Sequence, residues 1–314
     1  MASSAWRHAA PIGRGSGRQA ICVSYHGGDM RATLLRSSVR SVVGADGYSL
    51  RYRVWPADEA LRATLILLHG VMSHSGWFQP LADHLGEAGL KIIGADRRGS
   101  GLNEEGRGDA PSARMLVDDV RRIIAAERSE GRPVHLAGWC WGAVLAVNVA
   151  ATCQQELASL VLIAPGLHPS EAVTAAMKRQ DAIARHPHCG ALAIPITEDM
   201  FTRGPHLAAI EADELRCRLI TPRFHNIMRK LGVGAKLRLG QLDLPMLLVL
   251  AGTDEATDNF HTRRTFAALR RSAVTIKEIC GSHGLQFEAP DQLADAVASF
   301  TAIVGDPADV RHAG

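Results

Sequence analysis

The sequence predicts an α/β fold, a doubly wound, mostly parallel sheet with a helical insertion. Short apolar runs of strand length alternate with longer segments of helical apolar spacing, a pattern typical of such sheets. One interval, from Pro165 to Pro245, spans about 80 residues and is too long for a bare loop in a compact domain. At 314 residues, the chain can form one large domain that contains this insertion, or two small domains.

The first 37 residues are rich in Ser, Arg and Gly, and Asp29 is their only acidic residue. This composition resembles that of a transit peptide, but the segment lacks the apolar stretch of a secretion signal. We therefore expect residues 1–37 to be a flexible extension. A targeting segment and a true start at Met30 both stay open.

A β-hairpin is expected next, because Asp-Gly within residues 44–47 supplies a turn between strand-like residues 42–43 and 50–54. Strand and helix patterns then alternate along the chain. The expected strands are residues 64–68, 91–95, 134–137, 160–163, 246–250 and 274–279, and the expected helices are residues 78–88, 111–129 and 291–303.

Residues 167–244 form the insertion in a core made of residues 38–166 and 245–304, with residues 305–314 as a tail. We expect the insertion to be a helical lid over the functional site. A peripheral decoration remote from that site is the alternative. The apolar residues whose spacing fits a helix face are Ala209, Ile210, Leu215, Leu219, Phe224, Ile227, Met228 and Leu231.

A Gly-x-Cys-x-Gly motif at residues 138–142 places Cys140 between an apolar strand-like run and the helix-like residues 143–147. A strand, a tight turn and a helix form the context that a nucleophile elbow requires. Small residues beside the turn let the backbone bend sharply, and the helix N-terminus favours an anion there. We therefore expect Cys140 to act as a nucleophile in its thiolate form.

Asp254 and His283 follow Cys140 in the order nucleophile, acid, histidine. Asp254 comes shortly after the expected strand 246–250, and His283 lies in a loop after residues 274–279. The C-terminal ends of parallel strands meet at one edge of a sheet, so these side chains are expected to converge. The sequence predicts a catalytic triad, the alternative being a degenerate site on an intact fold.

The composition argues against several function classes. Lys and Arg number 35 against 32 Asp and Glu, and the basic residues are scattered, so we expect no nucleic-acid partner. No apolar run reaches the roughly 18 residues of a membrane span. Six irregularly spaced cysteines predict neither a disulfide framework nor a zinc site and fit a reducing, cytoplasmic compartment. Residues 186–189 hold two His and one Cys but fit a polar loop better, so we expect no metal and no cofactor.

Together these residues resemble the α/β-hydrolase superfamily, and within it the monoacylglycerol lipase or lysophospholipase-like branch, over residues 40–304. The resemblance implies that Cys140 is the nucleophile, His283 the base and Asp254 the orienting acid. It also implies that the backbone N–H groups of Val71 and Trp141 form an oxyanion hole. Besides the elbow, the matching segments are Leu-His-Gly-Val-Met-Ser-His-Ser-Gly at 68–76, Asp-Arg-Arg-Gly-Ser-Gly at 96–101, Gly-Thr-Asp at 252–254, and Glu288 behind the histidine.

Cysteine at the nucleophile position departs from the serine of that branch and is similar to dienelactone hydrolases and polyhydroxyalkanoate synthases. Attack by Cys140 on an ester or thioester leaves an acyl-cysteine, which can pass its acyl group to water or to another acceptor. We expect a thioesterase, esterase or acyltransferase that acts on a small-molecule acyl ester or thioester. Delivery by coenzyme A or a carrier protein stays open. So do a cyclase, lyase or C–C bond-forming enzyme, a silent ligand-binding protein, and the oligomeric state.

Four residues are candidates for the substrate pocket. Trp139 and Trp141 flank the nucleophile, and their apolar surface is expected to exclude water and to favour transfer over hydrolysis. Packing beneath the elbow is the alternative for Trp139 and, less so, for Trp141. Met72 and His74 lie in the loop that resembles the oxyanion-hole segment, where His74 also fits a polar rim.

Overall fold

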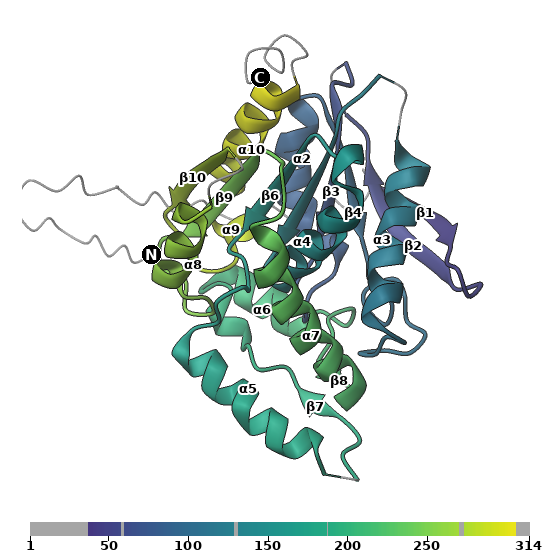
Figure 1. The fold of residues 1–314 in the computed structure, drawn as a ribbon, viewed down its shortest axis with the longest axis vertical. Helices are drawn as coiled ribbons and strands as arrows, with labels where there is room; N and C mark the ends of the chain where they lie inside the picture. The colour runs from purple at the N-terminus through teal and green to yellow at the C-terminus, as the bar shows by residue number, and fades with distance from the viewer. Residues whose placement is uncertain (1–36, 58–59, 129–130, 187, 270–272, 306–314) are drawn as a thin grey trace, which may run out of the picture.

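The computed structural model describes residues 37–57, 60–128, 131–186, 188–269 and 273–305. In this part of the chain, eight strands form one sheet in the order β1-β2-β4-β3-β5-β6-β9-β10 (Figure 1). β2 is antiparallel to both of its neighbours, and all other neighbouring strands are parallel, which confirms the predicted sheet. The strands are β1 (Ser38–Val43), β2 (Ser49–Trp55), β3 (Ala63–Leu68), β4 (Leu90–Ala95), β5 (Val134–Trp139), β6 (Ser159–Ile163), β9 (Met246–Ala251) and β10 (Val274–Ile279).

The central strands β3, β5, β6 and β9 are buried at every residue, whereas the edge strands β1 and β10 are largely exposed or half-buried. Strands that helices cover on both faces carry continuous apolar runs, which is why the sequence pattern located them. The main helices of the core are α2 (Gln79–Glu87), α3 (Ala113–Glu127), α4 (Trp141–Cys153), α8 (Asn259–Ala267), α9 (Leu285–Glu288) and α10 (Pro290–Gly305).

The chain reverses its direction across the sheet after β4. The connection from β3 to β4 runs one way, and the connections from β4 to β5 and β6 run the other way. Right-handed crossovers therefore place α2 on one face of the sheet and α3 and α4 on the opposite face. α10 packs against α2, and α3 packs against α4. The reversal point lies between β3 and β5, and the loops that follow these two strands are where such sheets hold ligands.

The insertion between β6 and β9 contains α5 (Glu171–Ala184), α6 (Pro205–Ala212) and α7 (Pro222–Leu239), grouped together at one end of the molecule in Figure 1. It also contains a short antiparallel pair, β7 (Leu192–Ala193) and β8 (Leu219–Ile220), which the sequence analysis missed.

Two of the apolar residues expected on helices of the insertion are elsewhere. Leu219 belongs to β8 and its side chain is 54% exposed, and Leu215 lies in a turn. The Asp213 carboxylate accepts the Leu215 N–H at 2.8 Å, a local turn that ends α6 before either residue. By contrast, Ile210, Phe224, Ile227, Met228 and Leu231 lie on helices and are buried as the spacing predicted.

The flexible extension expected at residues 1–37 and the tail at 305–314 lie outside the described residues, apart from Ser37 and Gly305. Among the described cysteines, Cys280 is disulfide-bonded, which the irregular cysteine spacing gave no sign of. The free cysteines are Cys140, Cys153, Cys189 and Cys217. Within the described residues, none of the helices combines the length and the apolar character needed to cross a bilayer.

Candidate active site

Cys140 lies at a strained turn between β5 and α4. Its backbone has φ 58° and ψ −125°, a conformation that costs free energy for a residue with a side chain. The flanking glycines make the turn possible because a Cβ on Gly138 would lie 2.4 Å from the Gly142 carbonyl oxygen, and one on Gly142 would lie 2.1 Å from that of Leu68. Two backbone hydrogen bonds fix the turn. The Cys140 N–H donates to the Ile163 carbonyl, and the Gly166 N–H donates to the Cys140 carbonyl. Strain maintained in this way is typical of functional sites.

Asp254 and His283 meet at the C-terminal edge of the sheet, as the sequence predicts. The two Asp254 carboxylate oxygens lie 3.1 and 2.9 Å from Nδ1 of His283. The same carboxylate accepts three further hydrogen bonds, from the backbone N–H of Ala256 and from the N–H and hydroxyl of Thr257. Burial raises the pKa of Asp254, but the histidine and these donors outweigh burial and lower it. Asp254 is therefore an ionised acceptor that fixes the imidazole.

Nε2 of His283 is the atom left for chemistry. It has no hydrogen bond of normal geometry within the described residues, although Cys140 is close enough to act on the charge of the ring. Burial lowers the pKa of His283, whereas the Asp254 carboxylate and then Cys140 raise it, with a net result of about 10. These surroundings favour the protonated imidazolium form of His283.

The loop after β3 runs directly against Cys140. A Cβ built on Gly70 would lie 3.2 Å from the Cβ of Cys140 and 3.4 Å from its Sγ, so only glycine allows this approach without a shift. The next residue, Val71, and the residue after the nucleophile, Trp141, both line the cavity at Cys140. Their backbone N–H groups have no acceptor among the described residues. Two free donors beside a nucleophile are what an oxyanion hole needs.

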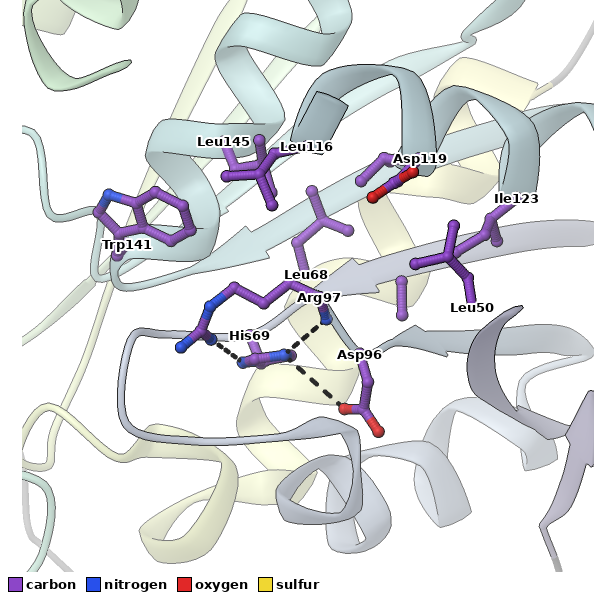
Figure 2. A pocket seen from close by; sticks show the side chains of 12 residues that line it. Leu50, Leu68, His69, Asp96, Arg97, Leu116, Asp119, Ile123, Trp141 and Leu145 are labelled. Atoms are coloured by element: carbon purple, nitrogen blue, oxygen red, sulfur yellow. Dashed lines mark hydrogen bonds and ion pairs between the residues drawn. The ribbon is translucent and has the colours of Figure 1, made fainter. Parts of the chain in front are cut away.

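Arg97, in the segment after β4, is hydrogen-bonded to this loop. Figure 2 shows its guanidinium beside His69, the first residue after β3. Its guanidinium donates to the carbonyl oxygen of Gly70 at 3.1 Å, to that of Val71 at 2.5 Å, and to the Ser100 hydroxyl at 3.2 Å. The Gly70 carbonyl and the Val71 N–H belong to one planar trans peptide unit, so they point in opposite directions. Fixing that carbonyl toward Arg97 therefore directs the Val71 N–H away from Arg97.

His69 supports the same peptide unit. Its Nε2 accepts the Arg97 backbone N–H at 3.2 Å (Figure 2), and its Nδ1 lies 2.8 Å from the Gly70 carbonyl oxygen. Burial first, and then the Arg97 charge, lowers the pKa of His69 well below its ordinary value. The ring is thus neutral, and because Nε2 accepts, Nδ1 carries the proton and donates to Gly70.

The Arg97 charge is buried without a carboxylate ion pair among the described residues. The guanidinium carbon lies 5.0 Å from the Phe224 ring centroid and 6.0 Å from that of Trp141, distances at which cation–π attraction offsets part of the desolvation. Phe224 belongs to α7 and Trp141 begins α4. Arg97 therefore connects the loop after β3, the turn at Cys140 and the insertion. We call the loop after β3 the oxyanion loop because of the role proposed for it below.

A cavity of about 380 Å³ begins at Cys140, Val71 and Trp141 and extends between α5 and α7. Its walls near the nucleophile are mainly apolar, and charged side chains occur farther along both helices. This volume is within the range of roughly 300–1,000 Å³ found for small-molecule sites. The lining residues are Val71, Cys140, Trp141, Val144, Gly166, Leu167, Pro169, Val173, Thr174, Met177, Lys178, Asp181, Ile194, Pro195, Ile196, Met228, Arg229, Gly232, Val233, Lys236, Ala256 and Thr257.

Of the four pocket candidates, Trp141 lines the cavity and the other three do not. Trp139 is fully buried on the other side of the nucleophile turn. Its indole N–H donates to the His283 carbonyl at 2.8 Å, and its ring centroid lies 5.5 Å from that of the imidazole. Trp139 is the last residue of a strand buried on both faces, so it packs beneath the histidine loop instead of facing the substrate space.

Met72 and His74 contact the insertion instead of the cavity. The Met72 carbonyl accepts the Cys217 N–H at 2.7 Å, and Nε2 of His74 lies 2.7 Å from the Asp213 carboxylate. Nδ1 of His74 accepts the Gly76 N–H, so Nε2 is the nitrogen that donates to Asp213. These contacts fasten the insertion to the loop after β3.

Sequence reasoning missed Arg97 and the charged side chains along the cavity. Arg97 lies within the segment 96–101 that resembles the family, but its partners are backbone carbonyls, which leave no mark in a sequence. Asp258, four residues after Asp254, accepts the His261 N–H at the start of α8 and is a helix cap. No group of three or more His, Cys, Asp or Glu side chains that could hold a metal occurs among the described residues.

Residues 59–290 match the family described as serine aminopeptidase S33 (Hydrolase_4). The chain belongs to this family. It is an α/β-hydrolase-fold hydrolase of the monoglyceride lipase-like group, with cysteine at the turn where a family named for serine enzymes implies serine.

Individual relatives are consistent with this assignment. Human monoglyceride lipase is 27% identical over 260 residues, which cover 80% of this chain and 84% of that protein. An abhydrolase domain-containing protein of Dictyostelium discoideum is 29% identical over 114 residues, 36% of this chain and only 12% of its own length. A soluble variant of monoglyceride lipase from Saccharomyces cerevisiae, solved with a substrate analogue, superposes with a TM-score of 0.74 at 15% identity and covers 86% of this chain and 96% of that chain. That similarity shows the fold.

Proposed function

We propose that this hydrolase is a cysteine-dependent acyl-processing enzyme that works through a covalent acyl-Cys140 intermediate. The observation that carries the proposal is the position of Cys140, at a strained turn, beside the buried His283–Asp254 pair and at the inner end of a largely apolar cavity. In this proposal, His283 is the base and general acid and Asp254 orients it. The Val71 and Trp141 N–H groups form the oxyanion hole.

In the acylation step, the Cys140 thiolate attacks the carbonyl carbon of an ester or thioester. The new C–S bond pushes the carbonyl electron pair onto oxygen, and the Val71 and Trp141 N–H groups receive that charge. When the tetrahedral species collapses, the bond to the alcohol or thiol breaks and His283 gives its Nε2 proton to the leaving group. The acyl group remains on Cys140 as a thioester.

In the second step, a water molecule attacks the thioester carbonyl while His283 takes one of its protons. Collapse of the second tetrahedral species expels the Cys140 thiolate and releases the carboxylic acid. His283 is then an imidazolium again, so the resting ion pair is restored. The peptide unit held by Arg97 serves the oxyanion in both steps.

The proposed substrate is a small-molecule acyl ester, with monoglycerides suggested by the names of the relatives, or a thioester delivered by coenzyme A or a carrier protein. Acyl transfer is the second candidate function. It is favoured by the burial of Cys140, which is 2% exposed, and by the Trp141 surface in the cavity wall, because a dry site protects a thioester from water.

We also propose that residues 167–244 are the lid of this site. The insertion supplies Phe201, whose carbonyl accepts the Gly284 N–H and the Ser282 hydroxyl on either side of His283. It also supplies the Cys217 N–H to the oxyanion loop. Contacts with both catalytic loops support a lid and not a remote decoration.

Intact-protein mass spectrometry after mixing with 4-nitrophenyl esters and acyl thioesters tests the proposal. The wild type is expected to gain one acyl mass, mapped to Cys140 by peptide analysis, and Cys140→Ala is expected to gain none. Cys140→Ser should keep only weak turnover, and the matched control Cys153→Ala, a buried free cysteine outside the cavity lining, should behave as the wild type. Turnover by Cys140→Ala within a few-fold of wild type would rule out the covalent mechanism. Product analysis with rising alcohol or amine separates transfer from hydrolysis.

A further inference from the structure

The cavity changes character along its length, from apolar at Cys140 to cationic between α5 and α7. On α5, the lining residues Thr174, Met177, Lys178 and Asp181 have the spacing i, i+3, i+4 and i+7. On α7, Arg229, Gly232, Val233 and Lys236 repeat that same spacing. Each set forms one face of its helix, so the two helices present matching faces to the same space.

The charges on these two faces do not cancel. Asp181 accepts hydrogen bonds from His225 at 2.7 Å and from Arg229, so its carboxylate is already paired with two side chains of α7. Lys178 and Lys236 remain, and neither has a carboxylate partner in the part of the chain that the structure describes. Three cations and one carboxylate lining one cavity leave a positive surplus at its outer part.

Two further observations indicate that this space accommodates a ligand. The indole N–H of Trp141 is buried beside Cys140 and has no acceptor among the described residues, although buried donors are normally paired. A Cβ built on Gly232 would meet nothing within 4 Å, and Val233 next to it is 63% exposed, so the α7 face is left unfilled. An unpaired donor, an open apolar face and a cationic end together describe an amphipathic binding site.

We propose that the acyl donor carries an anionic group, a carboxylate or a phosphate, that Lys178 and Lys236 bind while its carbonyl lies at Cys140. The inference rests on the proposed function, because it assumes that Cys140 receives the acyl group. The anion is either at the far end of the acyl chain or on the leaving group, and both are recognised by the same ammonium groups. Arg229, fixed by Asp181, lies on the same α7 face and adds to the local field.

Two matched substrate pairs test the proposal. The first is the 4-nitrophenyl monoester of a dicarboxylic acid against its methyl-capped analogue, and the second is an acyl-coenzyme A against the same acyl group on N-acetylcysteamine. The variants are Lys178→Gln, Lys236→Gln and their combination. The control is Lys230→Gln, which removes a cation of α7 that does not line the cavity.

For the wild type we expect kcat/KM to be about tenfold higher for the anionic member of at least one pair, which is the scale of two partly solvated ion pairs. This preference should decrease at high salt. In the double variant the ratio of kcat/KM for the anionic member to that for the neutral member should fall to about one, and Lys230→Gln should keep the wild-type ratio. No preference in the wild type, or a preference that the double variant retains, overturns the proposal. Failure of every substrate to acylate Cys140 would instead overturn the proposed function, so the two failures are distinguishable. The pair that shows the preference identifies where the anion resides.

Discussion

Replacing Arg97 tests the proposed oxyanion hole without removing a residue that lines the cavity, because Arg97 acts on the far side of the Gly70–Val71 peptide unit. Its planar fork donates to the Gly70 and Val71 carbonyls at once. A lysine has a single ammonium group and cannot reproduce the fork, and a methionine donates nothing. Arg97→Lys and Arg97→Met therefore loosen the peptide unit by different amounts.

The expected decrease in kcat follows from the number of N–H donors in the proposed oxyanion hole. Loss of one oxyanion-hole donor lowers kcat about 10²–10³-fold. Val71 supplies one of the two proposed donors, so that range is the upper limit for Arg97→Met, and about tenfold to a hundredfold is expected for Arg97→Lys. KM should stay within a few-fold because Arg97 does not line the cavity. A merely structural role would lower the amount of folded enzyme without changing the rate per active site.

The assay is the pre-steady-state burst of nitrophenolate, whose amplitude counts active sites and whose rate reports acylation of Cys140. Arg98→Lys is the matched control from the same turn, since Arg98 pairs with Asp46 and Asp119 and donates nothing to the oxyanion loop. It should lower the melting temperature and leave the burst rate within a few-fold. If folded Arg97→Met keeps the wild-type burst rate, or if only its KM rises, the assigned role of Arg97 is wrong.

Two further predictions concern charge and packing. The His283 imidazole should titrate near pH 10 instead of its ordinary 6.5, and Asp254→Asn should lower this pKa more than Cys140→Ala, as ¹⁵N NMR of labelled histidine can measure. Because the folded-state pKa is raised, the ion stabilises the fold below pH 6.5 and this contribution is lost as the pH rises through 10, which urea unfolding across that range checks. Gly142→Ala should destabilise the fold by more than about 2 kcal/mol because its Cβ would overlap the Leu68 carbonyl, whereas Gly232→Ala, in open space on α7, should stabilise it by up to about 1 kcal/mol. Equal melting temperatures for the two alanine variants would contradict the second prediction.

The sequence located the strands and the order of Cys140, Asp254 and His283 for one physical reason. Strands covered on both faces must be continuously apolar, so β3, β5, β6 and β9 are visible as runs, and the residues that follow such runs must gather at one edge of the sheet. The 2.9 Å contact between His283 and Asp254 agrees with that expectation. Topology alone was enough to bring these two side chains together.

Two features could not be predicted in this way. One is a contact between a side chain and backbone atoms, and the other is the side of the Cys140 turn on which each flanking tryptophan lies. Arg97 binds carbonyls of residues 70 and 71, and any sequence supplies carbonyls at those positions. Trp139 and Trp141 look equivalent beside Cys140, but one ends a strand and the other begins a helix, so they lie on different sides of the turn. The pair β7–β8 has two residues in each strand, too few for any periodicity to appear.

In the proposed mechanism, the fate of the acyl group depends more on the insertion than on Cys140, His283 and Asp254. Once the acyl-Cys140 thioester has formed, His283 can activate any acceptor that reaches it, so the chemistry of the second step is the same for water, alcohol or amine. Which acceptor arrives is decided along the cavity, and α5 and α7 provide its outer walls, with Lys178 and Lys236 among the lining residues. An anionic donor bound there would itself fill the path that water must take. An anion on the leaving group would vacate that path after acylation, whereas an anion on the acyl chain would keep it filled. A hydrolase and a transferase built on this core would therefore differ first in the residues of α5 and α7, while Cys140, His283 and the Arg97-held peptide unit could stay the same.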